Sequence, residues 1–240
     1  MNNTNSADFI PLRSIADLNS LDGAVSLAVN GLINRRRQEG TLRGLVTVNG
    51  RRKKISISGS LLGEIAAQIG GSLVGLFTPS TVDLYHVPEG SYIVINGFLP
   101  ICVKPDAPQV AVVLDEMSPE SLLLMLTSSD VAYGRLEGQE MLNGKPVWHY
   151  VINGQTFLAA ARNSSNPQLR TFAAGLWTAE DADLYVDKEG GYPVAFRGSY
   201  SGDFQPLKFA GLFEVNIELT AVNANTPVEL PPSCSDPIHI

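Results

Sequence analysis

The sequence has 240 residues, of which 44% are hydrophobic and 17% are charged, and its formal net charge is −7. This apolar content is sufficient for a folded core and excludes an intrinsically disordered chain. The negative charge argues against a general nucleic-acid-binding protein. The charge is uneven, because residues 1–60 contain nine Lys and Arg but only four Asp and Glu, which leaves −12 for the remainder.

Residues 1–20 are polar and are predicted to form a linker or tether. The segment lacks the apolar stretch of a secretory signal peptide. Two interpretations are open: the protein is cytoplasmic, or the sequence is a mature fragment to which Met1 was added.

Two runs of basic residues follow. They are interpreted either as solvated ends of hairpins or as a contact with an anionic membrane surface, where each basic residue contributes about 1 kcal/mol. The two runs consist of Arg35, Arg36, Arg37, Arg51, Arg52, Lys53 and Lys54.

The first half of the chain is predicted to be mainly β-structure. Strands are expected at 24–33, 41–48 and 54–58, with a two-residue turn at Asn49-Gly50. Another hairpin is expected from 81–87 and 91–96, followed by a Pro-rich loop over 98–110 and a short strand over 110–114. Five Asn-Gly dipeptides favour an antiparallel meander over βαβ units, whose crossovers need a dozen or more residues.

Two apolar helices are predicted beside these strands. Residues 60–77 have apolar residues at helical spacing, which indicates a helix on the sheet, as ordinary core or as a movable lid over an apolar cavity. The second helix, over 118–127, is apolar almost all round, so it must be buried or line an apolar space.

The second half is predicted to contain strands at 131–141, 147–152 and 156–161 and a helical turn between 166 and 177. Two strands within 181–202 follow, joined by a turn over 189–191, and the last strand, 212–221, alternates apolar and polar residues. We therefore expect an α+β fold, mainly antiparallel β, with about eleven strands in a curved sheet and two or three helices on its concave face. The expected single domain spans 21–232, and 233–240 form a tail.

Cys102 and Cys234 both lie in Pro-rich irregular stretches. Neither belongs to a CxxC pair, which disfavours a zinc site. A disulfide in an exported protein and two free thiols both remain open.

No constellation of catalytic residues stands out. The three histidines lack metal-ligand spacing, and neither a phosphate-binding loop nor a nucleophile elbow occurs. His149 lies in an alternating strand and is expected to be a hydrogen-bonded packing residue. We predict no catalytic residue, no metal and no cofactor.

Three segments carry a family resemblance: GRLEGQEMLNGKPVWHYVI (134–152), ADLYVDKEGGYPVAF (182–196) and NTPVELPP (225–232). They resemble the LolA-like superfamily, and the LppX/LprG-type envelope lipoproteins in particular. The resemblance implies an eleven-stranded half-barrel with helices on its open side and a cavity for lipid or acyl chains. It also implies an extracytoplasmic lipoprotein whose signal peptide and anchor are absent from this chain.

The resulting hypothesis is a non-catalytic protein that binds a lipid or another apolar ligand between the sheet and its helices. The alternative is an envelope interaction or sensor domain with a filled core, whose partner is the membrane surface or an envelope protein. The predicted apolar lining consists of Leu62, Ile65, Ile69, Leu73, Phe77, Leu122, Met125, Leu126, Phe196, Phe213, Val215 and Ile217.

Overall fold

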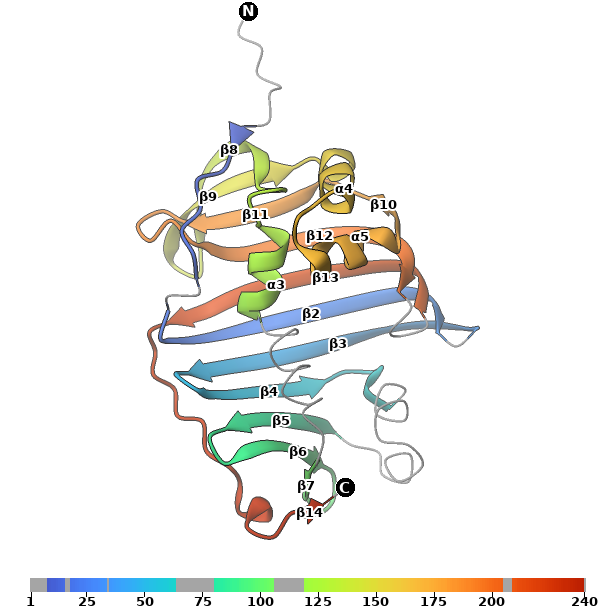
Figure 1. The fold of residues 1–240 in the computed structure, drawn as a ribbon, viewed down its shortest axis with the longest axis vertical. Coiled ribbons are helices and arrows are strands. Elements are labelled where there is room, and N and C mark those ends of the chain that lie inside the picture. Colours follow the sequence, from blue (N-terminus) through green and yellow to red (C-terminus); the bar gives the residue numbers. More distant parts are fainter. Residues whose placement is uncertain are drawn as a thin grey trace, which may run out of the picture. The chain divides into compact units, whose positions relative to one another are not determined.

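The structure is a computed structural model that describes residues 8–15, 18–33, 35–63, 80–105, 119–204 and 209–239. Its fourteen described strands are assigned to one open, predominantly antiparallel sheet with a few short helices (Figure 1). The predicted α+β class with mainly antiparallel β is therefore confirmed. The chain divides into two compact units: unit 1 contains Met1–Asp17, Ala28–Glu39 and Leu122–Glu218, and unit 2 contains Leu18–Leu27, Gly40–Ser121 and Leu219–Ile240.

Three long strands contribute a part to each unit: β2 (Ser20–Ile33), β3 (Arg36–Asn49) and β13 (Phe209–Val222). In unit 2 the strand order continues from β3 through β4, β5, β6 and β7 to β14, which is parallel to β7. The remaining elements of unit 2 are β4 (Arg52–Ser58), β5 (Thr81–Val87), β6 (Gly90–Asn96), β7 (Ile101–Lys104), the short 3-10 helix η2 (Pro232–Cys234) and β14 (Ile238–His239).

The predicted hairpins of unit 2 are confirmed, but its predicted loop is not entirely irregular. β3 and β4 pair up to Asn49 and Arg52, and Gly50 has the positive φ of 57° that such a tight turn requires. The expected Pro-rich loop over 98–110 contains strand β7, which pairs with β6 and buries Cys102. The strand expected over 110–114 and most of the helix expected over 60–77 lie outside the described residues.

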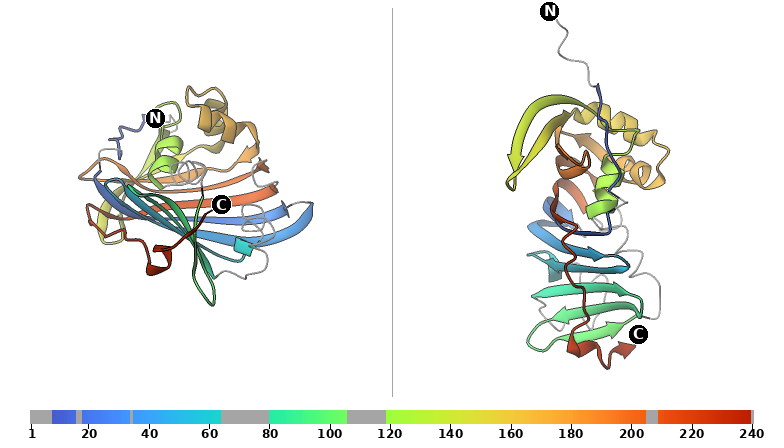
Figure 2. Two further views of the ribbon diagram at one scale, coloured as in Figure 1. Left: turned by 60° about the horizontal axis from the view of Figure 1, so that its bottom comes forward. Right: turned by 90° about the vertical axis from the view of Figure 1, so that its left-hand side faces the viewer.

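Unit 1 is arranged around strands in the order β1-β8-β9-β11-β12-β13-β2, and β10 pairs with β12. Helices α3, α4 and α5 lie on one side of these strands (Figures 1 and 2). The elements of unit 1 are β1 (Asp8–Phe9), most of α3 (Pro119–Leu126), β8 (Tyr133–Leu142), β9 (Lys145–Ile152), α4 (Gly154–Arg162), α5 (Pro167–Ala174), β10 (Leu176–Ala179), β11 (Ala182–Asp187) and β12 (Pro193–Phe204).

The predicted strand over 156–161 is wrong, because this segment is helix α4. Asn153, which lies between the predicted strands 147–152 and 156–161, is the N-cap of α4, and its side chain accepts a hydrogen bond from the Thr156 amide at 3.0 Å. Asp181 accepts another from the Gly154 amide at 2.9 Å. A run of three alanines follows, and the helix propensity of alanine favours α4 over a strand.

The hairpin of β11 and β12 is set by its turn. Asp187 is buried, and its carboxylate accepts hydrogen bonds from the amides of Glu189, at 3.1 Å, and Gly190. Gly191 takes a φ of 69°, a conformation that favours glycine. The predicted turn over 189–191 is confirmed.

Candidate functional site

The predicted apolar lining residues fall into three groups. In unit 1, Phe196, Ile217, Phe213 and Leu126 are buried, whereas Leu122, Met125 and Val215 are only partly buried. In unit 2, Leu62 is buried. The other predicted lining residues, Ile65, Ile69, Leu73 and Phe77, lie outside the described residues, so the lining as a set stays a prediction.

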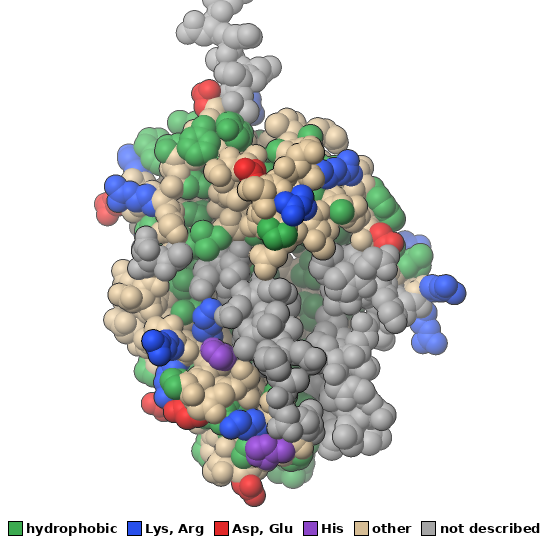
Figure 3. Space-filling view, in the orientation of Figure 1, with side chains coloured by type: hydrophobic (Ala, Val, Ile, Leu, Met, Phe, Trp, Pro, Cys, Tyr) green, Lys and Arg blue, Asp and Glu red, His purple; other side chains and the backbone are tan. Residues whose placement is uncertain are grey.

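Helix α3 has apolar residues on all sides, but only one of its sides is buried. Leu123 and Leu126 face inward and are almost fully buried, whereas Leu124 is 37% exposed and Leu122 and Met125 are partly exposed. In Figure 3 hydrophobic side chains are visible among the polar ones in the region of α3, α4 and α5. The helix therefore retains apolar surface that is partly exposed.

Five aromatic rings form a cluster where helices α4 and α5 pack on strands β12 and β13. Tyr200 of β12 is at its centre, with ring centroids 5.6 Å from Phe213 of β13, 5.5 Å from Phe172 of α5 and 6.1 Å from Phe157 of α4. Phe213 also contacts Phe209 at 6.1 Å. Sequence analysis missed the cluster, because α4 was expected to be a strand.

Tyr200 can lie flat on the sheet because Gly198, two residues earlier on the same face, has no side chain. A Cβ atom at Gly198 would lie 2.6 Å from the Tyr200 hydroxyl oxygen and 2.9 Å from two of its ring carbons. The hydroxyl therefore lies above the backbone of Gly198. Val215, which faces Gly198 across β12 and β13, is only partly buried.

The Tyr200 hydroxyl is buried, with 1% of the residue exposed, and has no hydrogen-bond partner among the described residues. Burial raises the pKa of this phenol well above its ordinary value, so it stays protonated and can donate a hydrogen bond. A buried hydroxyl without a partner costs about 1–3 kcal/mol. Buried polar groups in folded proteins nearly always have a hydrogen-bond partner, so the Tyr200 hydroxyl is an exception to that rule.

A second cluster lies on strands β8, β9 and β11. The two ring nitrogens of His149 lie 2.7 Å from Glu140 Oε1 and 2.8 Å from Asp183 Oδ1. The imidazole stacks on Tyr185 at 4.7 Å, and the guanidinium carbon of Arg197 lies 5.3 Å from the centre of that ring. Partial burial lowers the pKa of His149, but the hydrogen bonds and charges of the two carboxylates outweigh it, and the net pKa is raised.

This arrangement favours a structural role for His149. Because each ring nitrogen already contacts a carboxylate oxygen, the ring has no nitrogen left to accept a proton from a substrate or to ligate a metal. The expectation of a hydrogen-bonded histidine is confirmed. Among the described residues, no group of three or more His, Cys, Asp and Glu is arranged to hold a metal ion.

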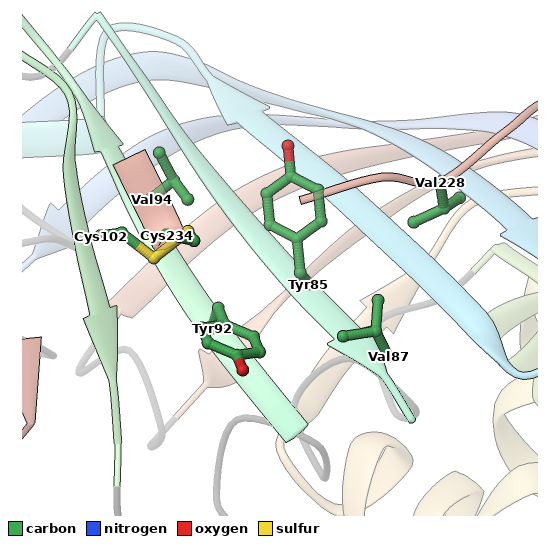
Figure 4. Close-up of a cluster of buried hydrophobic side chains, with 7 residues drawn as sticks. All are labelled: Tyr85, Val87, Tyr92, Val94, Cys102, Val228 and Cys234. Carbon is green, nitrogen blue, oxygen red and sulfur yellow. A yellow bond between two sulfur atoms is a disulfide. The ribbon is translucent and has the colours of Figure 1, made fainter. Parts of the chain in front are cut away.

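A disulfide joins Cys102 of β7 to Cys234 of η2 within unit 2, which decides between the two alternatives for the cysteines. It belongs to a buried cluster with side chains of β5, β6 and the C-terminal segment (Figure 4). Disulfides persist in oxidising compartments, so this bond indicates an extracytoplasmic protein. The other members of the cluster are Tyr85, Val87, Tyr92, Val94 and Val228.

The first basic run, Arg35 to Arg37, lies at the β2–β3 turn of unit 1, and its three residues are exposed. Arg35 has a φ of 66°. The membrane contact of this run stays a prediction.

The second basic run, at the β3–β4 hairpin of unit 2, is partly engaged with the protein itself. Arg51 is exposed and Lys53 is partly buried. Arg52 pairs with Glu89 at 3.1 Å, and Lys54 pairs with Asp83 at 3.3 Å. Arg52 and Lys54 therefore have intramolecular partners that would compete with a membrane surface.

Comparison with known proteins does not assign a family. No family model matches the chain, and no curated protein matches it either. A solved structure of a DUF1329 family protein from Desulfovibrio piger ATCC 29098 is similar at 6% identity over 89% of this chain and 88% of that chain, with a TM-score of 0.26. A TM-score this low supports no argument about fold or function. Among the described residues, no helix has the length and hydrophobicity needed to cross a membrane.

Proposed function

We propose that this protein is a non-catalytic extracytoplasmic domain that binds a lipid or another apolar ligand between its sheet and its helices, with part of the ligand covering the exposed side of α3. The main support for the proposal is the solvent exposure of apolar side chains on helix α3. Leu124 is exposed, and Leu122 and Met125 are partly exposed. Exposed apolar surface of this kind marks ligand grooves and interaction sites.

The energetics favour an apolar ligand at this position. Each Å² of apolar surface removed from water contributes about 25 cal/mol, before the cost of ordering the ligand is subtracted. A long acyl chain that covers α3 removes apolar surface on both partners. The affinity then comes from burial alone and requires no covalent chemistry.

The resemblance of 134–152, 182–196 and 225–232 to LolA-like envelope lipoproteins supports the same function. The Cys102–Cys234 disulfide is compatible with it, because such proteins are exported to an oxidising compartment. Anchoring through a lipid in the native precursor, and carriage of the ligand within the cell envelope, are part of this proposal.

A second candidate function is the envelope interaction domain with a filled core. It is favoured by the β6–β7 connection, where Phe98 is fully exposed and Leu99 is 71% exposed. Exposed apolar surface is a feature of sites that bind a partner, and these two adjacent side chains contribute such surface.

Binding of a fluorescent fatty acid to the purified protein tests the first function. Leu124→Asp places a charge on the exposed side of α3 and is expected to weaken binding at least tenfold. Met141→Asp is the matched control, because Met141 is an exposed apolar residue on β8. Equal affinities for the wild type and the Leu124→Asp variant would contradict a site at α3, and absence of binding to the wild type would favour the interaction domain.

A further inference from the structure

The chain that follows β13, residues 223–239, runs across unit 2 from β2 to β7, and we call it the C-terminal strap (Figure 1). It begins against β2, where the amide of Asn223 donates a hydrogen bond to the Ser20 carbonyl at 2.8 Å. The strap ends as β14, which pairs with β7 at the last position of the strand order. It therefore links strands that lie far apart in the sheet.

The first part of the strap is held by three strands in turn. The Thr226 hydroxyl donates to the Asp22 carboxylate of β2 at 2.6 Å, and the Asn49 amide group of β3 donates to the Thr226 carbonyl at 3.1 Å. Arg52 of β4 donates to the carbonyl of Val228 at 3.3 Å. The Val228 side chain is also buried. Residues 223–228 thus have both polar and apolar contacts with the sheet.

The second part of the strap depends much more on the disulfide. Beyond Val228, the side chain of Leu230 packs on the cluster around Cys102 and Cys234, and it is only partly buried. Strand β14 is two residues long, pairs in parallel with β7, and leaves Ile238 55% exposed. Such a short parallel pairing contributes little stability. The covalent bond is therefore the strongest attachment of residues 229–239.

This second part covers two features of unit 2. One is the buried cluster that contains Tyr85, Tyr92 and Val94 of β5 and β6 (Figure 4). The other is the outer edge of β7, which β14 occupies at Val103 and Lys104. An uncovered strand edge offers unpaired backbone groups to another chain, and an uncovered apolar cluster is a binding surface.

We infer that the Cys102–Cys234 bond is a redox lock on the C-terminal strap, and that its reduction by a dithiol releases residues 229–239 while residues 223–228 stay bound. The dithiol supplies two electrons and two protons, the S–S bond is replaced by two thiols, and the dithiol closes to its own disulfide. Release uncovers the cluster and the edge of β7. The inference goes beyond the proposed function, because it concerns unit 2 and requires no ligand at α3.

Hydrogen exchange measured by mass spectrometry, before and after reduction with dithiothreitol, tests the inference. Exchange at the amides of 233–239 should rise about tenfold or more, as expected for a segment that opens locally. Exchange at Asn223 and within β8 and β9 should stay unchanged. The double variant Cys102→Ser/Cys234→Ser is the matched control. Its strap should be open without dithiothreitol, and addition of the dithiol should change nothing.

The other outcomes overturn the inference. If thiol labelling shows complete reduction and the exchange pattern is unchanged, non-covalent contacts hold the strap and the bond is no lock. If exchange rises throughout unit 2, the bond maintains the fold of the unit and not the position of the strap. Reoxidation should restore slow exchange at 233–239, and a failure to do so would exclude a reversible lock.

Discussion

His149 and Asp183 lie on neighbouring strands, β9 and β11, with Nε2 and Oδ1 2.8 Å apart. Glu140 on β8 contacts the other ring nitrogen at 2.7 Å, so one imidazole connects three strands of unit 1. The protonated ring can donate to both carboxylates at once, whereas the neutral ring can donate to only one of them. The stability of this part of the sheet is therefore linked to the charge of His149.

The first prediction concerns the pH dependence of stability. The folded-state pKa of His149 is raised above its ordinary value of 6.5, so its contribution is fully present below pH 6.5 and is lost as the pH rises through the folded-state pKa. His149→Gln should therefore lower the free energy of unfolding by roughly 0.5–1 kcal/mol at pH 5.5, since the carboxylates are partly exposed and screened. The difference should shrink at pH 9. Urea unfolding at both pH values measures it, and a loss that is larger at pH 9 would contradict the assignment.

The second prediction concerns the disulfide. Cys102 and Cys234 are 132 residues apart in the sequence, so the bond restricts a long loop of the unfolded chain. Replacement of both by alanine should lower the free energy of unfolding by about 2–4 kcal/mol. The same loss is expected for the wild type in reducing agent, and urea unfolding measures both. Identical unfolding midpoints with and without the bond would show that it does not stabilise the fold.

The third prediction tests the packing of Tyr200 on Gly198. The Cβ atom of Gly198→Ala would overlap a buried ring that is held by three others, so the variant should lose roughly 1–3 kcal/mol of stability. Gly97→Ala is the control, because a Cβ atom there meets nothing within 4 Å. Thermal unfolding compares the two variants, and equal midpoints would mean that Tyr200 does not lie over Gly198.

The fourth prediction concerns the start of α4. Asn153→Ala removes the side-chain acceptor of the Thr156 amide and should destabilise the protein by about 1 kcal/mol. Asn153→Ser retains an N-cap acceptor and should recover most of that loss. Chemical denaturation of the pair is the measurement. An alanine variant as stable as the wild type would exclude a capping role.

Much of the fold could be predicted from the sequence because its signals are local. Period-two alternation marked β13, and Asn-Gly and Glu-Gly-Gly turns marked the hairpins that close at Asn143 and Asp187. The apolar run over 118–127 marked α3. The short strands β1, β10 and β14 have no such pattern, because two to four residues carry too little periodicity.

The misassigned strand at 156–161 shows where local signals compete. Asn-Gly is frequent in hairpin turns, but asparagine is also a strong N-cap, and only the alanine run after Thr156 separates the two outcomes. The unpaired hydroxyl of Tyr200 and the pair of carboxylates on His149 could not be predicted. Both depend on residues that are distant in sequence and adjacent only in the folded sheet.

Native mass spectrometry of the purified protein, followed by solvent extraction and lipid analysis, tests the central claim most directly. The account predicts a bound acyl species of defined mass, which leaves on extraction. A protein that is empty in the spectrometer, and that also fails to bind fluorescent fatty acids, would contradict the account and favour the interaction domain.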